Sequence, residues 1–164
     1  RQGDWMWLVS SLPQMKVLDV VRDPRGIYAS WKTTEPFVSL LRAGGYYSLA
    51  GVCYDFAQNL DLQDSRVHHI VFEELMSSPE DVMKRAYEFL GRPFGQREMD
   101  WINSTFAATD CPEPKPWEVN FTDCHSNNGT VHETWREVLS DQEKRSFAED
   151  PNCRRVAEAY GYEI

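Results

Sequence analysis

The chain has 164 residues, of which 41% are hydrophobic, and its formal net charge at pH 7 is -9. This length suits one compact domain with its own core. No stretch approaches the roughly 18 consecutive apolar residues of a membrane-spanning helix. The acidic balance argues against nonspecific nucleic-acid binding, which needs a basic surface. Because the sequence starts at Arg1 without a signal segment, we expect a fragment or a processed product.

The first predicted elements are a strand and a helix joined by a tight turn. Residues 15–21 (MKVLDVV) are apolar and β-branched and are followed by Asp23-Pro24, which predicts a buried strand. Pro24 suits the first position of a helix, where its missing N–H costs nothing, and Asp23 is the expected N-cap. The helix is expected to continue to Lys32.

This turn carries groups that suit a phosphate. Free backbone N–H groups and the positive end of a helix dipole meet there, and Arg22 and Arg25 add guanidinium groups that match phosphate oxygens. Ser30 lies farther along the same helix, on the face of Gly26, and adds a hydroxyl. The alternative is an ordinary α/β turn with surface arginines, and this stretch alone leaves both readings open.

Further helices and one more strand follow along the chain. Apolar residues at three- and four-residue steps predict a helix over 46–62, and HHIVF (68–72) predicts a second buried strand. His68 and His69 should face opposite sides of that strand. A catalytic histidine and a hydrogen-bonded structural histidine are the two alternatives, and the second is the commoner role.

Capping patterns place the remaining helices. Ser78-Pro79 predicts a helix start with Ser78 as N-cap, and Gly91 predicts its end. A helix over 96–106, a capping box at Ser140 and a last helix from Asp150-Pro151 to Gly161 follow. Strands that alternate with helices predict an α/β fold with a mainly parallel sheet flanked by helices.

Cysteines and glycosylation sequons favour a secretory compartment. The four cysteines allow three pairings, of which Cys111–Cys124 is favoured because these residues flank a loop. A zinc site built from Cys111, Cys124, His125 and His132 is the weaker alternative, since the spacing fits no standard site. Asn-x-Ser/Thr sequons occur at positions 103, 120 and 128, in the same half of the chain.

Ordered motifs give a resemblance to a known family. No GxSxG, HExxH, GxGxxG or Walker A sequence occurs. VVRDPRGIYAS, IVFEELMSSPEDVMKRAYEFLG, EMDWINSTF, SNNGTVHETWREVL and CRRVAEAYGY instead resemble, in family order, the Golgi carbohydrate sulfotransferases. The similarity is closest to those that sulfate the 6-hydroxyl of galactose, N-acetylglucosamine or N-acetylgalactosamine. It implies that residues 1–164 form the C-terminal part of one sulfotransferase domain, a partial P-loop-type three-layer fold.

The resemblance also implies a donor and a set of binding residues. Sulfuryl would pass in line from 3′-phosphoadenosine 5′-phosphosulfate to a sugar hydroxyl of a glycan, without a metal. Arg22 and Ser30 have the family's spacing for the 3′-phosphate, with Arg25 beside them. Phe72 replaces the family's Tyr and would keep adenine stacking. Asn128 and Gly129 resemble a second phosphate loop, although a glycosylated surface turn is the open alternative.

One departure limits the activity expected of this chain. The family's basic 5′-phosphosulfate loop is absent from the sequence and would lie upstream of Arg1, so we expect little or no transferase activity from the chain alone. Glu73 and Glu74 could form an acid/base pair, but support of the following turn is the commoner role. The rival hypotheses are a luminal nucleotide- or glycan-binding module without catalysis, and a P-loop kinase relative.

The expected setting follows from the same resemblance. It implies the Golgi lumen, with an anchor to the membrane that this sequence does not contain, or secretion. The acceptor sugar, the catalytic base and the oligomeric state are not legible in the sequence.

Overall fold

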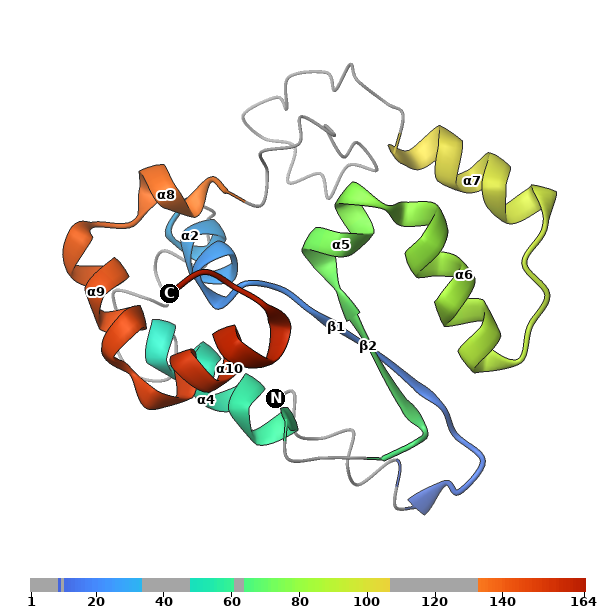
Figure 1. The fold of residues 1–164 in the computed structure, drawn as a ribbon, viewed down its shortest axis with the longest axis horizontal. Helices are drawn as coiled ribbons and strands as arrows, with labels where there is room; N and C mark the ends of the chain where they lie inside the picture. The colour runs from blue at the N-terminus through green and yellow to red at the C-terminus, as the bar shows by residue number, and fades with distance from the viewer. Residues whose placement is uncertain (1–8, 10, 34–47, 61–63, 107–132) are drawn as a thin grey trace. The chain divides into compact units, whose positions relative to one another are not determined.

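The computed structural model describes residues 9, 11–33, 48–60, 64–106 and 133–164. The chain separates into two compact units, residues 1–72 with 132–164 and residues 73–131 (Figure 1). Residues Asn128 and Gly129, the pair Cys111–Cys124 and the zinc alternative lie outside the described residues.

The first unit contains a parallel pair of strands, as predicted. β1 (Val17–Val21) pairs with β2 (Val67–Val71), with Val17 opposite Val67 and Val21 opposite Val71. Phe72, predicted as the last strand residue, instead begins α5 (Phe72–Ser77). Its partner in this register would be Arg22, where the first strand already turns toward a helix, so no ladder remains for it to join.

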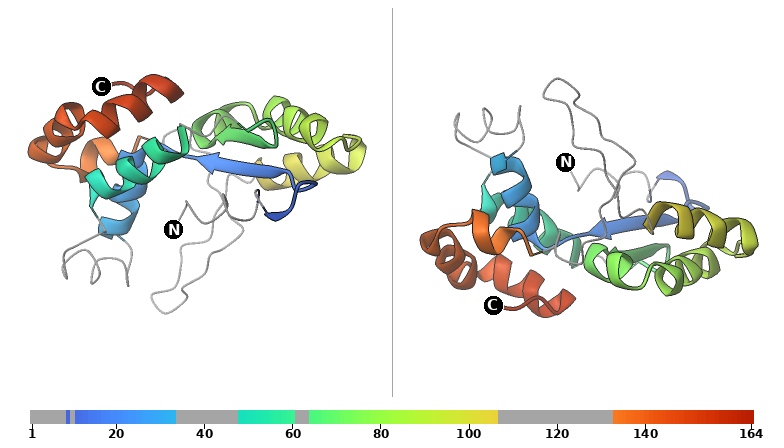
Figure 2. Two further views of the ribbon diagram at one scale, coloured as in Figure 1. Left: turned by 90° about the horizontal axis from the view of Figure 1, so that it is seen from below. Right: turned by 90° about the horizontal axis from the view of Figure 1, so that it is seen from above.

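The described residues of the first unit also form five helices, which gather at one side of it, and β1 leads directly into the first of them (Figure 2). They are α2 (Pro24–Thr33), α4 (Leu49–Leu60), α8 (Trp135–Val138), α9 (Asp141–Glu149) and α10 (Pro151–Tyr160). α4 packs against both α10 and α2, and α2 also contacts α8. Residues far apart in the sequence therefore form one core around α2 and α4.

A disulfide lies inside this core. Cys53 of α4 and Cys153 of α10 are bonded, with their Cα atoms 4.8 Å apart and 100 residues between them in sequence. Both are fully buried and pack with Leu49, Phe147 and Ala157. The cross-link joins the two helices that make the most extensive helix–helix contact in the unit.

The predicted caps of the C-terminal helices are confirmed. Ser140 forms a complete capping box with Glu143 at the start of α9. Asp150 accepts hydrogen bonds from the backbone N–H groups of Asn152 and Cys153 at the start of α10. Gly161 ends that helix with a φ of 74°, a conformation that favours glycine.

The second unit contains most of α5 and two longer helices. α6 (Pro79–Leu90) and α7 (Gln96–Phe106) match the predicted ranges and pack against each other. Gly91 ends α6 with a φ of 70°, as predicted, but the Ser78 side chain accepts no capping hydrogen bond. Ser78 has a ψ of 60°, outside the extended conformation in which an N-cap hydroxyl reaches the first turn.

Candidate functional site

The candidate site begins where β1 runs into α2. Pro24 is the first residue of α2, and the Oδ1 atom of Asp23 accepts a hydrogen bond of 2.8 Å from the backbone N–H of Arg25. The predicted role of Asp23 as helix cap is therefore confirmed. Asp23, Pro24 and Arg25 are all buried. The turn is therefore held in place by packing in the core of the first unit.

Arg25 makes contacts that differ from those of an exposed phosphate ligand. Its Nη2 atom lies 2.7 Å from Oδ2 of Asp23, and both side chains are 6% exposed. Its guanidinium also lies 3.9 Å from the ring centroid of Trp135 and 4.4 Å from that of Phe147. The expected convergence of Arg22 and Arg25 on one spot is thus replaced by a buried ion pair between two aromatic rings.

Arg22 occupies a different environment, at the end of β1. Its guanidinium lies over the Phe72 ring, 4.8 Å from the centroid. The side chain also runs past Gly26, where a Cβ atom would lie only 3.1 Å from Nε and 3.4 Å from Nη2 of Arg22. Glycine at position 26 therefore provides the space that lets the guanidinium lie against the first turn of α2.

Ser30 follows on the same face of α2. Gly26 and Ser30 are four residues apart in one helix, so their Cβ directions lie one above the other. Ser30 is exposed, and its hydroxyl donates no hydrogen bond to another residue in the described ranges. The Arg22 guanidinium beside Gly26 and the Ser30 hydroxyl one turn farther along thus share one helix face, as the sequence predicted.

Phe72, the residue that follows the second strand, contacts Arg22. Because Val21 pairs with Val71, the residues that follow each strand, Arg22 and Phe72, leave the parallel pair side by side. The half-buried Phe72 ring stacks on the guanidinium. This support was not predicted from the sequence, where Phe72 was expected to contact adenine. The sequence signal that could have revealed it is the parallel alignment of the two predicted strands, which places the residues after their ends next to each other.

His69 is hydrogen-bonded, which agrees with the commoner of its two predicted roles. Its Nδ1 atom lies 3.1 Å from Oδ2 of Asp19, the residue opposite it on β1. The ring centroids of His69 and Tyr160 are 6.0 Å apart. Burial together with the charge of Asp19 raises the pKa of Tyr160 to about 12. Tyr160 therefore stays protonated near neutral pH and cannot serve as a base there.

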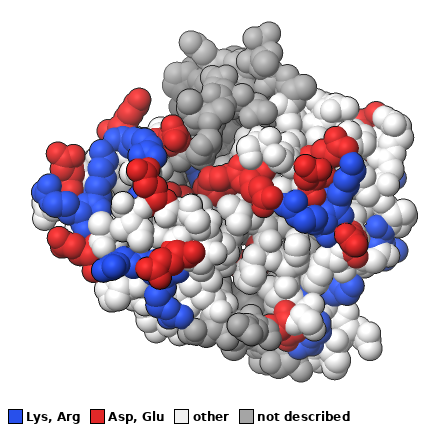
Figure 3. All heavy atoms as spheres, viewed as in Figure 1, with Lys and Arg blue, Asp and Glu red and all other residues white. Residues whose placement is uncertain are grey.

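Among the other candidates, Glu74 is held in a surface ion pair, and Asn128 and Gly129 lie outside the described residues. Glu74 pairs with Arg85 of α6, which agrees with a supporting role. The face shown in Figure 3 has Lys and Arg interleaved with Asp and Glu. No group of three metal-ligating side chains occurs in the described residues, and none of their helices is long and apolar enough to cross a membrane.

Comparisons with known proteins agree with the sequence motifs. The model of the sulfotransferase family matches residues 5–96, which include Arg22, Ser30 and Phe72. Carbohydrate sulfotransferase 1 of zebrafish (Danio rerio) is 28% identical over 77% of this chain and 33% of its own length. Carbohydrate sulfotransferase 1 of the mouse (Mus musculus) is 28% identical over 92% of this chain and 39% of its own length.

A solved structure supports the fold. The crystal structure of mouse sulfotransferase SULT7A1 complexed with PAP has a TM-score of 0.52 and 17% identity, and covers 95% of this chain and 66% of that one. The present chain spans between about a third and two fifths of the length of the curated relatives described above. With more than half of its residues matched by the family model, the chain belongs to the sulfotransferase family.

Proposed function

We propose that this chain binds the 3′-phosphate of 3′-phosphoadenosine 5′-phosphosulfate through Arg22 and Ser30. It would serve as part of an enzyme that transfers sulfuryl to a sugar hydroxyl of a glycan. The observation that carries the proposal is the shared face of α2, where the Arg22 guanidinium lies against Gly26 and Ser30 follows one turn later. A guanidinium and a hydroxyl on one rigid helix can bind two oxygens of the same phosphate.

The surroundings of Arg22 support its role as a binding group. The Phe72 ring and the Gly26 backbone limit where the guanidinium can lie, so less conformational entropy is lost when a phosphate binds. The start of α2 adds a positive dipole end near the same turn. Phe72 thus has a positioning role in this proposal, and its stacking on adenine stays a prediction.

Arg25 has a supporting part in the proposal. Its ion pair with Asp23 and its aromatic contacts fix the turn from the core side. Direct contact of Arg25, Asn128 or Gly129 with the donor stays a prediction from the family resemblance.

The chemistry that these residues can perform is binding and orientation. In sulfuryl transfer from the donor to a sugar hydroxyl, the acceptor oxygen attacks sulfur in line and loses its proton to a base. The bond between sulfur and the bridging oxygen of the phosphosulfate breaks, and adenosine 3′,5′-bisphosphate leaves. Holding the 3′-phosphate fixes the nucleotide end of the donor, which contributes through positioning. Two relatives carry the name carbohydrate sulfotransferase, and the solved neighbour is complexed with PAP. These names support both the donor and the glycan acceptor.

The cross-linked core supports a luminal setting. Cys53 and Cys153 are fully buried and bonded in the described part of the chain, and disulfides persist in oxidising compartments. We therefore propose that the protein works in the Golgi lumen or is secreted. Treatment of the protein from secretory cells with a thiol reagent, before and after reduction, tests whether Cys53 and Cys153 are bonded.

Titration of adenosine 3′,5′-bisphosphate against the full-length protein and its Arg22→Ala variant tests the donor site. We expect calorimetry to give a loss of about 2–4 kcal/mol, because a charge-assisted partner of the phosphate is removed. Arg92→Ala, an exposed arginine after α6, is the matched control and should bind as the wild type does. Equal affinity of the Arg22→Ala variant would remove Arg22 from the site. Turnover of donor with a sugar acceptor by the same protein separates an enzyme from a binding module.

A further inference from the structure

The second unit contains a groove that the donor site does not use. It has a volume of about 470 Å³ and is lined by residues of α6 and α7: Met83, Tyr87, Arg97, Glu98, Trp101 and Ile102. They form pairs four residues apart, so each helix turns one face toward the groove. This volume falls within the usual range for small-molecule sites, about 300–1,000 Å³.

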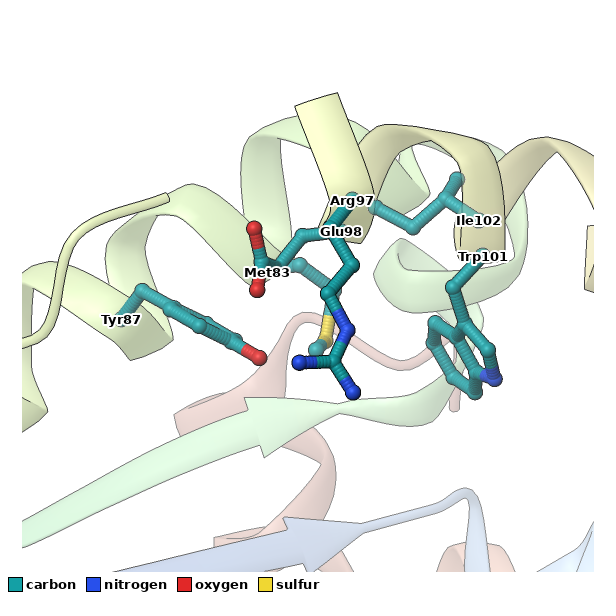
Figure 4. A pocket seen from close by; sticks show the side chains of 6 residues that line it. All are labelled: Met83, Tyr87, Arg97, Glu98, Trp101 and Ile102. Atoms are coloured by element: carbon teal, nitrogen blue, oxygen red, sulfur yellow. The ribbon is translucent and has the colours of Figure 1, made fainter. Parts of the chain in front are cut away.

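Two aromatic rings flank the groove. Figure 4 shows Tyr87 and Trp101 on either side of it, with the Arg97 guanidinium and the Met83 thioether between them. Trp101 is 53% exposed, although a tryptophan of a folded protein is usually well buried. The groove therefore offers two separated aromatic faces to a ligand.

Other aromatic residues hold both rings in place. Tyr87 makes an edge-to-face contact with Phe94, at 5.4 Å between centroids, and Trp101 makes one with Phe106, at 6.3 Å. Such pairs fix the ring planes and add roughly 0.5–1.5 kcal/mol beyond area burial. Since the rings are already oriented, binding would order few side chains.

Charge in the groove favours an anion. Within the described residues, Arg97 forms no ion pair or hydrogen bond through its side chain. Among the described residues of the lining, Glu98 is the one acidic residue, and its Oε2 atom accepts a hydrogen bond of 3.0 Å from the backbone N–H of Gly95. The carboxylate is thereby directed to the start of its own helix, and the guanidinium is left as the available charged group.

We propose that this groove binds a sulfated segment of a sugar chain. The apolar faces of sugar rings would lie on Tyr87 and Trp101, and the sulfate would pair with Arg97, whose planar fork matches two oxyanion oxygens. The choice of a sugar chain rests on the proposed function, whereas the groove and its charge are independent of it. The sulfate bound here would be one that the glycan already carries. It would be a different group from the hydroxyl that accepts the new sulfuryl group.

Direct binding measurements test this site without any transferase assay. The full-length protein is titrated with an N-acetyllactosamine tetrasaccharide that carries 6-O-sulfate and with its unsulfated counterpart. We expect the sulfated probe to bind at least about tenfold more tightly. Arg97→Gln should abolish that difference, and Trp101→Ala should weaken both probes about tenfold or more. Because Trp101 is largely exposed, its truncation leaves the core intact, which circular dichroism checks.

Two control variants separate this inference from the proposed function. Arg92→Gln removes an exposed arginine outside the groove lining and should bind both probes as the wild type does. Arg22→Ala should lose affinity for adenosine 3′,5′-bisphosphate and keep affinity for the sulfated probe. Equal binding of the two probes to wild type, or unchanged binding by Trp101→Ala, would overturn the groove site even if nucleotide binding is intact. Binding of an anionic peptide in place of either sugar would overturn it too.

Discussion

The start of α2 has two sides with very different surroundings. Arg25 lies on one side and Arg22 on the other, although they are only three residues apart in sequence. On one side, Arg25 is 5% exposed, paired with Asp23 and enclosed by Trp135 and Phe147. On the other, Arg22 lies on the half-buried Phe72 ring and along the bare backbone of Gly26. The first side has the contacts of a folded core, and the second has those of a positioned binding group.

This difference shows how one short element can be both rigid and open to a ligand. The Arg25 guanidinium connects the turn to helices from the C-terminal part of the chain, because it contacts the rings of Trp135 in α8 and Phe147 in α9. A turn held from one side can present its other side to a ligand without loss of shape. Variants of the two arginines should therefore separate stability from nucleotide affinity.

A large loss of stability is expected from Arg25→Ala. Truncation breaks the buried ion pair between Arg25 and Asp23, which costs about 3–5 kcal/mol of unfolding free energy. Urea unfolding followed by circular dichroism measures it. Arg22→Ala is the matched control and should destabilise less, because it leaves the buried ion pair between Arg25 and Asp23 in place. Similar losses for both variants would contradict the division between the two sides.

Removal of the disulfide should act on the Arg25 side alone. Cys53 and Cys153 pack with Phe147, one of the rings that enclose Arg25. The cross-link spans 100 residues, for which chain-entropy models give about 4–5 kcal/mol. We expect the Cys53→Ala/Cys153→Ala variant to lose most of that stability. At temperatures where it stays folded, its affinity for adenosine 3′,5′-bisphosphate should match the wild type, and a matching loss of affinity would show that the two sides are coupled.

Much of this fold could be predicted from local sequence signals. The Asp23-Pro24 start of α2, the capping box at Ser140 and the helix over 96–106 all rest on rules that act within a few residues. The parallel strand pair followed from the alternation of strands and helices. Local rules failed at Ser78, whose backbone conformation keeps its hydroxyl from the helix.

The surroundings of the two arginines could not be predicted in the same way. Both arginines suit a phosphate by residue type and position, and the sequence gives no reason to separate them. What separates them is tertiary: Trp135 and Phe147 come from more than 100 residues away, and Phe72 reaches Arg22 through the register of β1 and β2. The Ser30 face could be predicted, because it depends on helical spacing alone.

Gly26→Ala should reduce nucleotide affinity without loss of stability. Gly26 lies in a helix, so alanine favours the helix by up to about 1 kcal/mol. The new methyl group would lie 3.1 Å from Nε of Arg22 and push the guanidinium from its place. We expect about tenfold weaker binding of adenosine 3′,5′-bisphosphate, which calorimetry measures, with an unchanged or raised melting temperature. Gly95→Ala in the second unit is the control. Its new methyl group would lie 3.7 Å from Oε2 of Glu98, an ordinary contact distance, and far along the sequence from Arg22.

The smallest expected effect concerns the far end of α2. Lys32 donates hydrogen bonds of 2.9 and 2.8 Å to both carboxylate oxygens of Glu143. Burial acts to raise the pKa of Glu143, but the hydrogen bonds from Lys32 and Ser140 outweigh it, and the pKa lies below its ordinary value of 4.5. A lowered carboxyl pKa contributes stability above pH 4.5, which is lost as the pH falls through the folded-state value. Because the pair is partly exposed, Lys32→Met should cost at most about 1 kcal/mol at pH 7. In urea unfolding measured across pH, that cost should shrink as the pH falls below 4.5 and through the folded-state pKa of Glu143. A cost independent of pH would show that Lys32 acts through packing alone.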